Sequence, residues 1–418
     1  MSVAKIKGFS DLFAPESNTF TYIEEQARAV FFSYGFTELR TPIMERTELF
    51  KRSIGEDTDV VHKEMYTLTT ESGKSYSLRP EATAGVMRAY IEKALNASTQ
   101  VARLFTTGPM FRHERPQKGR LRQFHQINCE CIGSQSPYAD ADMICMLLHF
   151  LRAINVRDVA LELNSLGCAE CRPKFTSALK DYFSHIASDE LCEDCRRRIT
   201  SNPLRVLDCK NERCKAHVAK APVIADFLCQ ACTDHFSVVT ETLKAENIAY
   251  HQNPNLVRGL DYYTRTTFEV VSTGIGSQSA VAGGGRYDGL IKALGGPDVP
   301  GIGFACGMER LAMLMEKKEP PRPDFFMAVL EPDAFPRAFA LIQELRTNGL
   351  KGCMNLQPQS VKSVFRQADK SLATYCLILG SDELAQNAVT VKSMSTSSQT
   401  TIAQDALVQH LQEALKKG

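Results

Sequence analysis

A charged, proline-rich stretch, "EKKEPPRPDFF" at residues 316–326, separates two parts of this chain that differ in their pattern of hydrophobic residues. After it, the short apolar runs "FFMAVLE", "GCMNL" and "TYCLILG" alternate with helical segments. Alternation of this kind predicts a small α/β domain with a largely parallel core. The length of 418 residues agrees with this division, since one compact core rarely holds so many residues.

A second change of composition lies at residues 165–240, which hold eight of the fourteen cysteines. Strand-like runs such as "GFTELRTPI" and "RLFTTGPMFRHE" precede this zone, and "GIGFACGMERLAMLM" follows it, so we predict an insertion into one folded unit. The predicted domains are residues 1–164 and 241–320 for the two parts of that unit, 165–240 for the insertion, and 321–418 for the last domain.

The overall composition argues against several classes of protein. Hydrophobic residues at 44% and charged residues at 23% are ordinary soluble-protein values, and a net charge of +1 predicts no binding of nucleic acid or membrane through bulk charge. No apolar run approaches the roughly eighteen residues of a membrane span, and "MSVAKIKGFSDLF" lacks the apolar region of a signal peptide. We therefore expect a cytoplasmic location, no membrane association, and cysteines that are thiols or metal ligands.

Polar side chains follow one face of a predicted strand, "GRLRQFHQINCECIG" at residues 119–133. The preceding run ends in Arg112 and Glu114, and the loop "RPQKG" between the two runs predicts an antiparallel hairpin. A run of charge alone is more often a solvated face. Here, however, alternate residues place cations, a ring, an amide and a carboxylate in one line. The residues of this face are Arg120, Arg122, Phe124, Gln126, Asn128 and Glu130.

Two further residues favour a binding site over a solvated face. Glu81 follows "SLRP" where a strand gives way to a helix, and Arg310 lies in the first turn of the helix that begins near Gly307. A cation there opposes the helix dipole, so an anionic ligand explains it better than a structural role. Arginines facing phosphates, beside a ring that stacks on a base, suit attack of a carboxylate on the α-phosphate of ATP.

Glycine-rich nucleotide-binding motifs of other kinds give little support. The absence of "GxxxxGK[ST]" argues against a P-loop enzyme. The run "GGGRYDGL" at residues 283–290 lacks the following helix and distal acid of a dinucleotide site, and we predict a tight turn beside the site.

Five motifs together resemble those of class II aminoacyl-tRNA synthetases. "GFTELRTPIMERTELF", "GPMFRHERPQKGRLRQFHQ" and "GIGFACGMERL" are similar to the three signatures of the class, and "LRPEATAG" and "LVRGLDYYTRTTFEV" are similar to histidyl-tRNA synthetases in particular. The resemblance covers nearly the whole chain. It implies an α+β fold, in which an antiparallel sheet flanked by helices carries the cysteine-rich insertion and is followed by a C-terminal α/β anticodon-binding domain. Ala82 stands where the family motif has glycine, a small change that should leave the activity intact.

The resemblance implies activation of histidine by ATP, with Mg²⁺, and transfer to histidine tRNA by a homodimer. Arg258 and Arg112 would be the catalytic residues, at the α-phosphate. Strand alternation, in contrast, argues that Tyr262 faces away from Tyr263. The residues implied for histidine are Glu81, Thr83, Gln126, Glu130, Tyr262 and Tyr263; those for ATP are Arg112, Glu114, Phe124, Arg258 and Arg310; and those for the extra guanosine of histidine tRNA are Gln117 and Arg122.

Two rival functions fit the sequence less well. A catalytically silent paralogue that binds histidine or regulates its biosynthesis would tend to lack the phosphate-facing arginines and the last domain, and both are present. A class II synthetase for proline or threonine would not explain Glu130 and Tyr263 on either side of one small ring.

The cysteines of the insertion form four pairs. Three pairs have the CxxC spacing, and four pairs are enough for two tetrahedral zinc sites with four thiolates each. The alternative is a helical module whose thiols are remnants of a lost site. The basic runs "CRRR" and "CKNERCK" predict that the insertion faces the tRNA acceptor arm. The candidate zinc ligands are Cys168, Cys171, Cys192, Cys195, Cys209, Cys214, Cys229 and Cys232.

Overall fold

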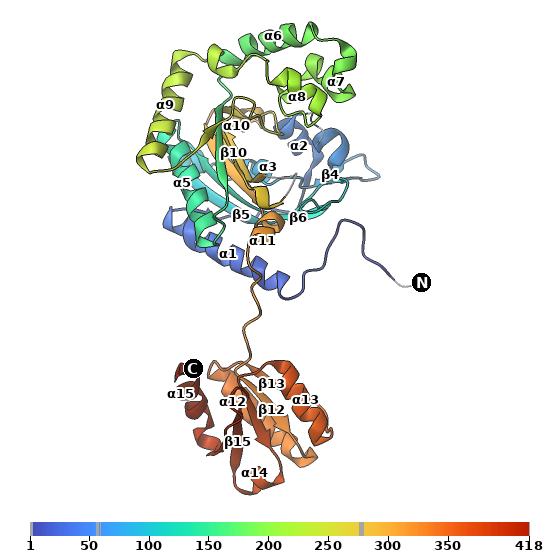
Figure 1. Cartoon of the computed structure of the whole chain (residues 1–418), viewed down its shortest axis with the longest axis vertical. Helices are drawn as coiled ribbons and strands as arrows, with labels where there is room; N and C mark the ends of the chain where they lie inside the picture. Colours follow the sequence, from blue (N-terminus) through green and yellow to red (C-terminus); the bar gives the residue numbers. More distant parts are fainter. Residues whose placement is uncertain (1–2, 56–57, 59, 276–279, 418) are drawn as a thin grey trace. The chain divides into compact units, whose positions relative to one another are not determined.

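The computed structural model describes residues 3–55, 58, 60–275 and 280–417, and the chain divides into two compact units, residues 1–319 and 320–418 (Figure 1). The finer boundaries of the insertion remain a prediction. None of the helices in the described part of the chain combines the length and the apolar composition that a membrane crossing requires.

One mixed sheet organises the larger unit. Its eight strands are β1 (Thr37–Glu38), β5 (Ala102–Phe111), β6 (Gln123–Ile132), β7 (Ala160–Ser165), β8 (His251–Gln252), β9 (Thr264–Val271), β10 (Ala280–Arg286) and β11 (Gly301–Gly307). Their order across the sheet is β1-β5-β6-β11-β10-β9-β7-β8. The inner neighbours are antiparallel, as predicted, whereas the edge strands β1 and β8 each pair in parallel. The predicted hairpin is β5 and β6, which are paired along all ten residues.

Four helices cover one face of this sheet: α1 (Glu16–Ser33), α5 (Pro137–Ala153), α9 (Gln230–Ala245) and α11 (Met308–Leu314). Figure 1 shows α5 beside α9 on this face, in agreement with their extensive packing. The apolar stripe of α1 lies on the sheet, where the Phe31 ring centroid is 5.3 Å from that of Phe105 and 5.4 Å from that of Phe150. Helix α1 begins directly after Pro15. The burial of this stripe leaves the opposite face of the sheet for other contacts.

The opposite face of the sheet packs against α3 (Thr83–Glu92) and α10 (Leu290–Ala293). Beside it lie α4 (Leu95–Ser98), α2 (Thr47–Ile54) and a small antiparallel sheet of β2 (Met44–Arg46), β4 (Ser75–Leu78) and β3 (Thr67–Thr69). Only part of this face is apolar, and the polar remainder surrounds the candidate site.

Two predictions about strands on this face are only partly right. Strand β6 begins at Gln123, so Arg120 and Arg122 lie in the hairpin loop and not on the strand face. The backbone N–H groups of Arg122 and Gln123 both donate to the carbonyl of Gly8, so the N-terminal arm takes over the hydrogen bonds at that end. In the run 283–290, which was predicted to be a tight turn, the glycines 283–285 belong to strand β10, and the turn is confined to Asp288 and Gly289.

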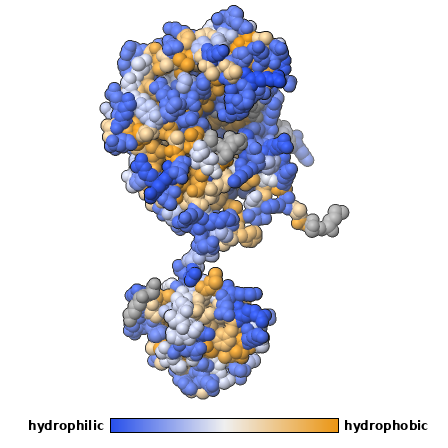
Figure 2. All heavy atoms as spheres, in the orientation of Figure 1, coloured by the Kyte–Doolittle hydropathy of each residue, from blue (hydrophilic) through white to orange (hydrophobic). Residues whose placement is uncertain are grey.

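Residues of the predicted insertion form helices around a core of their own. These helices are α6 (Cys171–Ser184), α7 (Glu193–Ser201), α8 (Glu212–Val218) and the start of α9, with the 3₁₀ turn η3 (Pro203–Val206) between α7 and α8. Their core includes the buried side chains of Phe175, Leu179 and Phe183, and it also takes in Val257 and Tyr263 from the segment before β9. On the face seen in Figure 2, mostly hydrophilic residues cover α7 and α8. The insertion is therefore packed against the segment that carries Arg258.

The smaller unit is an α/β domain, as predicted. Strands β13 (Gly352–Met354), β12 (Phe325–Val329) and β14 (Tyr375–Leu379) are parallel, and helices α12 (Phe335–Thr347), α13 (Val361–Ser371) and α15 (Leu407–Lys417) accompany them. The predicted pattern missed an antiparallel pair, β15 (Ala388–Ser393) and β16 (Gln399–Ala403), which extends the sheet next to β14, after the short helix α14 (Ser381–Ala385). The residues of β16 are mostly exposed and polar, so a prediction based on apolar runs did not identify this strand.

Candidate active site

Strand β6 carries the polar centre of the site on the face opposite the helix-covered core. Ile127 and Cys129 point into that core, so Gln126, Asn128 and Glu130 point the other way. Among the residues that the structure describes, Gln126 Oε1 and Asn128 Oδ1 are buried side-chain oxygens without a hydrogen-bond partner. Buried acceptors are nearly always paired in folded proteins, so we expect these two oxygens to accept hydrogen bonds from a ligand or from water.

Glu130 is the most enclosed carboxyl group of the site, with 1% of the residue exposed. Thr83 Oγ1 donates to Glu130 Oε1 at 2.7 Å, and the Tyr287 hydroxyl donates to Oε2. Burial raises the pKa of Glu130 to about 8, and the hydrogen bonds from Tyr287 and Thr83 oppose that rise. In the protein alone, this carboxyl group therefore holds a proton near neutral pH.

Gly303 makes room for this carboxyl group. It pairs with Glu130 across strands β11 and β6, and a Cβ on Gly303 would lie only 1.8 Å from Glu130 Oε2. Any other residue at this position would displace the carboxylate, so the glycine of "GIGFACG" is needed by the pocket.

Glu81 lies at the start of helix α3 and accepts from the backbone N–H groups of Thr83, at 2.6 Å, and Ala84, at 2.9 Å. Its buried carboxylate thus satisfies two N–H groups that a helix start leaves unpaired. The neighbouring Ala82 has φ −100°, a conformation that requires no glycine. The departure from the family motif at this position therefore introduces no backbone strain.

Tyr262 and Tyr263 lie before the strand, since β9 begins at Thr264. Strand alternation does not apply to them, and the prediction that Tyr262 faces away from Tyr263 is wrong. Their ring centroids are 4.6 Å apart, and the Tyr262 ring also meets Tyr287 edge-on at 5.8 Å. Both tyrosines thus belong to the aromatic group around Glu130.

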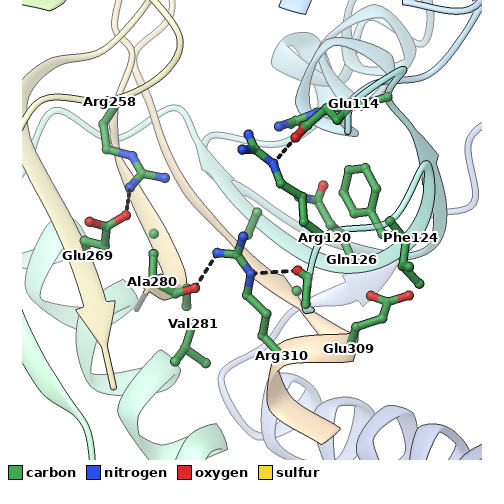
Figure 3. Close-up of a pocket in the computed structure, with 17 residues that line it drawn as sticks. Glu114, Arg120, Phe124, Gln126, Arg258, Glu269, Ala280, Val281, Glu309 and Arg310 are labelled. Carbon is green, nitrogen blue, oxygen red and sulfur yellow. Dashed lines mark hydrogen bonds and ion pairs between the residues drawn. The ribbon is translucent and has the colours of Figure 1, made fainter. Parts of the chain in front are cut away.

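The residues predicted for ATP line a single open pocket (Figure 3). Its walls come from the β5–β6 hairpin, the segment before β9, strand β10 and the start of α11. Two lining carboxylates, Glu269 and Glu309, were not predicted. The predicted residues in the lining are Arg112, Glu114, Phe124, Gln126, Arg258 and Arg310.

Arg258 projects toward this pocket above the glycine strand β10. Its Nη1 donates to Glu269 Oε1 at 2.8 Å, and its buried Nε has no acceptor in the described part of the chain. A Cβ on Gly283 would lie 2.4 Å from Nη1, so the glycine run serves as a floor for the guanidinium group. An unpaired, buried N–H on an arginine is suited to an incoming anionic oxygen.

Arg112 and Arg310 lie on the other walls of the pocket. Arg112 Nε donates to the Pro80 carbonyl at 2.9 Å, and its guanidinium carbon lies 5.3 Å from the centre of the Phe124 ring. Arg310 donates to the carbonyls of Ala280, at 2.6 Å, and Gly119, at 3.2 Å (Figure 3). These two bonds give Arg310 a structural role as well. Its position in the first turn of the helix had predicted only a role in binding an anionic ligand.

The hairpin loop holds the residues predicted to face RNA. Glu114 forms an ion pair with Arg120. Arg122 Nε donates to the Glu114 carbonyl at 3.2 Å, so Arg122 fastens the loop from within. Gln117 is exposed and forms a bridge with Arg120. Whether Gln117 and Arg122 contact RNA stays a prediction.

The eight cysteines of the insertion gather into two groups of four. Within each group the Sγ atoms all lie within 4.8 Å of one another, and recorded separations are 3.6 and 3.8 Å in the first group and 3.7 Å in the second. A tetrahedron of thiolates about 2.3 Å from a zinc ion has edges of about 3.8 Å, whereas a disulfide would require about 2.05 Å. The first group is Cys168, Cys171, Cys229 and Cys232, and the second is Cys192, Cys195, Cys209 and Cys214.

Three residues of the site were not predicted from the sequence: Glu269, Glu309 and Tyr287. Glu269 lies within the quoted run "TRTTFEV", and Tyr287 follows the glycine run, so both were visible as polar neighbours of predicted site residues. Tyr287 and Glu130 are 157 residues apart in the sequence, and only the pairing of β10 through β11 with β6 brings them together.

Comparisons with known proteins agree with this geometry. The family model for histidyl-tRNA synthetase matches residues 8–311, and that for an anticodon-binding domain matches residues 324–414. Histidine–tRNA ligase of Oleidesulfovibrio alaskensis is 60% identical, over 97% of this chain and 98% of its own length, and that of Solidesulfovibrio magneticus is 56% identical, over 100% and 99%.

A solved structure gives the same result. The apo histidyl-tRNA synthetase of S. aureus superposes with a TM-score of 0.83 at 33% identity, covering 98% of this chain and 100% of that one. The resemblance of the five motifs is thereby confirmed, as is the fold class with its helix-flanked sheet and C-terminal domain. This chain belongs to the histidyl-tRNA synthetase family of class II aminoacyl-tRNA synthetases.

Proposed function

We propose that this chain joins histidine to its tRNA in two steps, as its family does. The histidine carboxylate attacks the α-phosphorus of ATP, and pyrophosphate leaves. A terminal ribose hydroxyl of the tRNA then attacks the carbonyl carbon of histidyl-adenylate, and AMP leaves. The observation that carries this proposal is the buried group of polar side chains around Glu130, which shares strand β6 with an arginine-lined pocket.

Histidine is the amino acid that this pocket suits. Glu130 would hold one ring nitrogen and Tyr263 the other, while Glu81, Thr83 and Gln126 would receive the α-ammonium group. The unpaired oxygen of Gln126 supports this assignment, because an ammonium group offers three donors. Tyr262 closes the aromatic wall beside Tyr263.

Arginines perform the work at the phosphates. Arg258 and Arg112 would stabilise the charge that develops on the α-phosphate, Arg310 would hold the γ-phosphate, and Phe124 would stack on adenine with Glu114 nearby. Class II synthetases use ATP with Mg²⁺, which shields phosphate charge when bound. Each pocket carboxylate already has a partner, Glu114 with Arg120, Glu269 with Arg258 and Glu309 with His125.

One assay tests the proposal directly. ATP–pyrophosphate exchange measured with each of the twenty amino acids should proceed with histidine alone, because a site built to hydrogen-bond a ring rejects ligands that leave its polar groups unpaired. Equal exchange with proline or threonine would refute the specificity. Binding of histidine without any exchange would favour the silent paralogue instead.

We also propose the partners that the family implies: histidine tRNA, with Gln117 and Arg122 at its acceptor end, and a second copy of the chain. Three exposed apolar residues on the small sheet and the segment before it support a self-association surface, Ile43, Met44 and Leu68. Light scattering of the purified protein should give a dimer. The cytoplasmic location stays a prediction.

Zinc is the metal that we propose for both cysteine groups. Four sulfur ligands with the separations of a ZnS₄ tetrahedron favour it. In each group a backbone N–H donates to a ligand sulfur, from Cys229 to Cys171 at 3.1 Å and from Cys192 to Cys214 at 3.3 Å, as expected around metal-bound thiolates. Elemental analysis should find two zinc ions per chain, and Cys229→Ser and Cys209→Ser should each remove one. Metal-free protein with eight reactive thiols would contradict this.

A further inference from the structure

Residues 256–263, here called the substrate loop, carry Arg258, Tyr262 and Tyr263 but contain no helix or strand of their own. Their position therefore depends on what holds them from outside. On the side of the large sheet, the Asn164 side chain of β7 donates to the carbonyls of Pro254, at 3.2 Å, and Leu256, at 3.1 Å. These bonds fix where the loop begins.

The insertion holds the remainder of the loop. Arg205, in the turn η3, donates from Nη1 to the backbone carbonyl of Arg258 at 2.9 Å. Asn202, just before that turn, donates from Nδ2 to Asp261 Oδ1 at 2.8 Å. Two side chains of the insertion thus reach the loop on either side of Gly259 and Leu260.

Apolar packing joins the same two segments. Val257 and Tyr263 are 9% and 7% exposed, and they belong to one buried cluster with Val206 and Leu207 of the insertion. One wall of the proposed histidine pocket is therefore also part of the core of the cysteine-rich region.

The second cysteine group encloses the segment that makes these contacts. Cys195 precedes Asn202 and Arg205, Cys209 follows them, and both sulfurs belong to the same tetrahedral group, together with Cys192 and Cys214. An ion at this group would cross-link residues 195 and 209 and close the intervening segment into a loop, which reduces its freedom in the absence of other constraints.

We propose that metal binding at Cys192, Cys195, Cys209 and Cys214 holds the segment 196–208 as a bracket for the substrate loop, with Arg205 and Asn202 as positioning residues for Arg258 and Tyr263. The proposal rests on the adenylation function proposed above. It assigns the insertion a part in the activation of histidine, a step that needs no RNA.

Arg205 acts at the peptide from which the proposed catalytic arginine projects. A shift of about 1 Å in a group that acts on the transition state can lower the rate roughly 100-fold, even when the altered residue lies away from the reacting atoms. An insertion that serves only to contact tRNA would leave the activation step unchanged. Pyrophosphate exchange without tRNA therefore separates the two roles.

The experiment compares Arg205→Ala, Arg205→Lys and Asn202→Ala with Arg213→Ala, an exposed arginine on α8 in the same region. We expect Arg205→Ala to lower kcat for exchange roughly 10- to 100-fold with little change in KM for ATP. Arg205→Lys should restore part of the rate, since lysine keeps one charged donor. Asn202→Ala should raise KM for histidine a few-fold, and Arg213→Ala should behave as the parent chain.

Hydrogen exchange followed by mass spectrometry supplies a readout that does not depend on activity. Peptides from 256–263 should exchange faster in Arg205→Ala and in Cys209→Ser, or after a chelator removes zinc, while peptides from 325–415 stay unchanged. Zinc content should remain complete in Arg205→Ala, which shows that the fold of the insertion is intact.

Normal kcat and normal exchange at 256–263 in Arg205→Ala would overturn the proposal, as would loss of zinc without any change at those residues. If the parent chain supports no histidine-dependent pyrophosphate exchange, the function proposed above fails. The hydrogen-exchange result would still show whether the bracket holds the loop, so the two failures are distinguishable.

Discussion

The two ends of strand β6 lie in surroundings of opposite character. Around Glu130 the groups are buried and already bonded to one another, Thr83 and Tyr287 donating to the two carboxyl oxygens. Around Phe124 the pocket is open and lined by arginines, of which Arg258 keeps an unpaired N–H. The Glu130 end is organised by hydrogen bonds among buried polar groups, and the Phe124 end by positive charge.

This difference suggests a division of labour between recognition and catalysis. A closed pocket with fixed donors and acceptors discriminates among ligands by leaving wrong partners unpaired. Arginines directed at phosphates act mainly where charge develops, which is in the transition state. Changes at the Glu130 end should therefore alter KM and specificity, whereas changes at the Arg258 end should alter kcat.

The largest expected effect comes from Arg258→Ala. Loss of one group that stabilises transition-state charge commonly costs about 2.7 to 4 kcal/mol, or roughly 10²- to 10³-fold in rate. Single-turnover formation of the adenylate should slow by that factor, while histidine binding measured by calorimetry stays within a few-fold. If the variant keeps its rate and loses only affinity for histidine, the proposed division between recognition at Glu130 and catalysis at Arg258 is wrong.

A smaller effect is expected from Glu130→Gln, and it should appear in KM for histidine and not in kcat. The amide offers one acceptor oxygen in place of two, so it cannot accept from Thr83, Tyr287 and a ring N–H together. Loss of a hydrogen bond involving a charged group costs about 1.5 to 3 kcal/mol, so KM for histidine should rise roughly 10- to 150-fold. Glu92→Gln, an exposed glutamate on α3, is the matched control.

The effect of pH should be smaller still. Because burial raises the pKa of Glu130 to about 8 and free imidazole titrates near 6.5, the carboxyl and the ring together hold one proton between those values. We expect the affinity for histidine to be highest there and to fall above pH 8, by at most about tenfold per pH unit, as Glu130 of the free protein loses that proton. Glu130→Gln should abolish this fall, and affinity that keeps rising above pH 8 in the parent chain would contradict the assignment.

The smallest effect concerns Gln117, an exposed residue of the hairpin loop that does not line the arginine-lined pocket. Gln117→Ala should leave pyrophosphate exchange normal and lower transfer to tRNA by about 2- to 10-fold, the usual value of one hydrogen bond. The loss should shrink on tRNA that lacks the extra guanosine. If the loop is only a charged surface, Gln117→Ala should have no effect, and Lys118→Ala should weaken all tRNAs alike with a smaller dependence on salt.

Residues that share a strand could be predicted from the sequence, because alternation fixes which of them share a face. Phe124, Gln126 and Glu130 were placed together in this way, and the hairpin of β5 and β6 followed from the loop between its strands. The order of the cysteine pairs was less accessible. The first pair joins the fourth and the second joins the third, an arrangement that depends on how α6, α7 and α9 pack and not on spacing.

Contacts between distant segments could not be predicted for the same reason. Arg258 and Glu269 face each other only because the substrate loop runs back over β9, and Tyr287, which follows β10, reaches Glu130 of β6 across the intervening strand β11. The start of β6 was misplaced because the N-terminal arm competes for its backbone N–H groups, an interaction invisible in a local pattern.

Strand β6 carries both Phe124 and Glu130, so it also fixes the distance between these two residues. At roughly 3.3 Å per residue, the six steps from Phe124 to Glu130 span about 20 Å along β6. This length fixes the separation between the proposed site for the adenine base, at Phe124, and the proposed site for the histidine ring, at Glu130. Insertion of one residue between Phe124 and Glu130 would increase this separation. It would also turn one of these two side chains toward the helix-covered core. Length and facing are thus fixed together, and this stretch of the chain should tolerate substitutions far better than insertions or deletions.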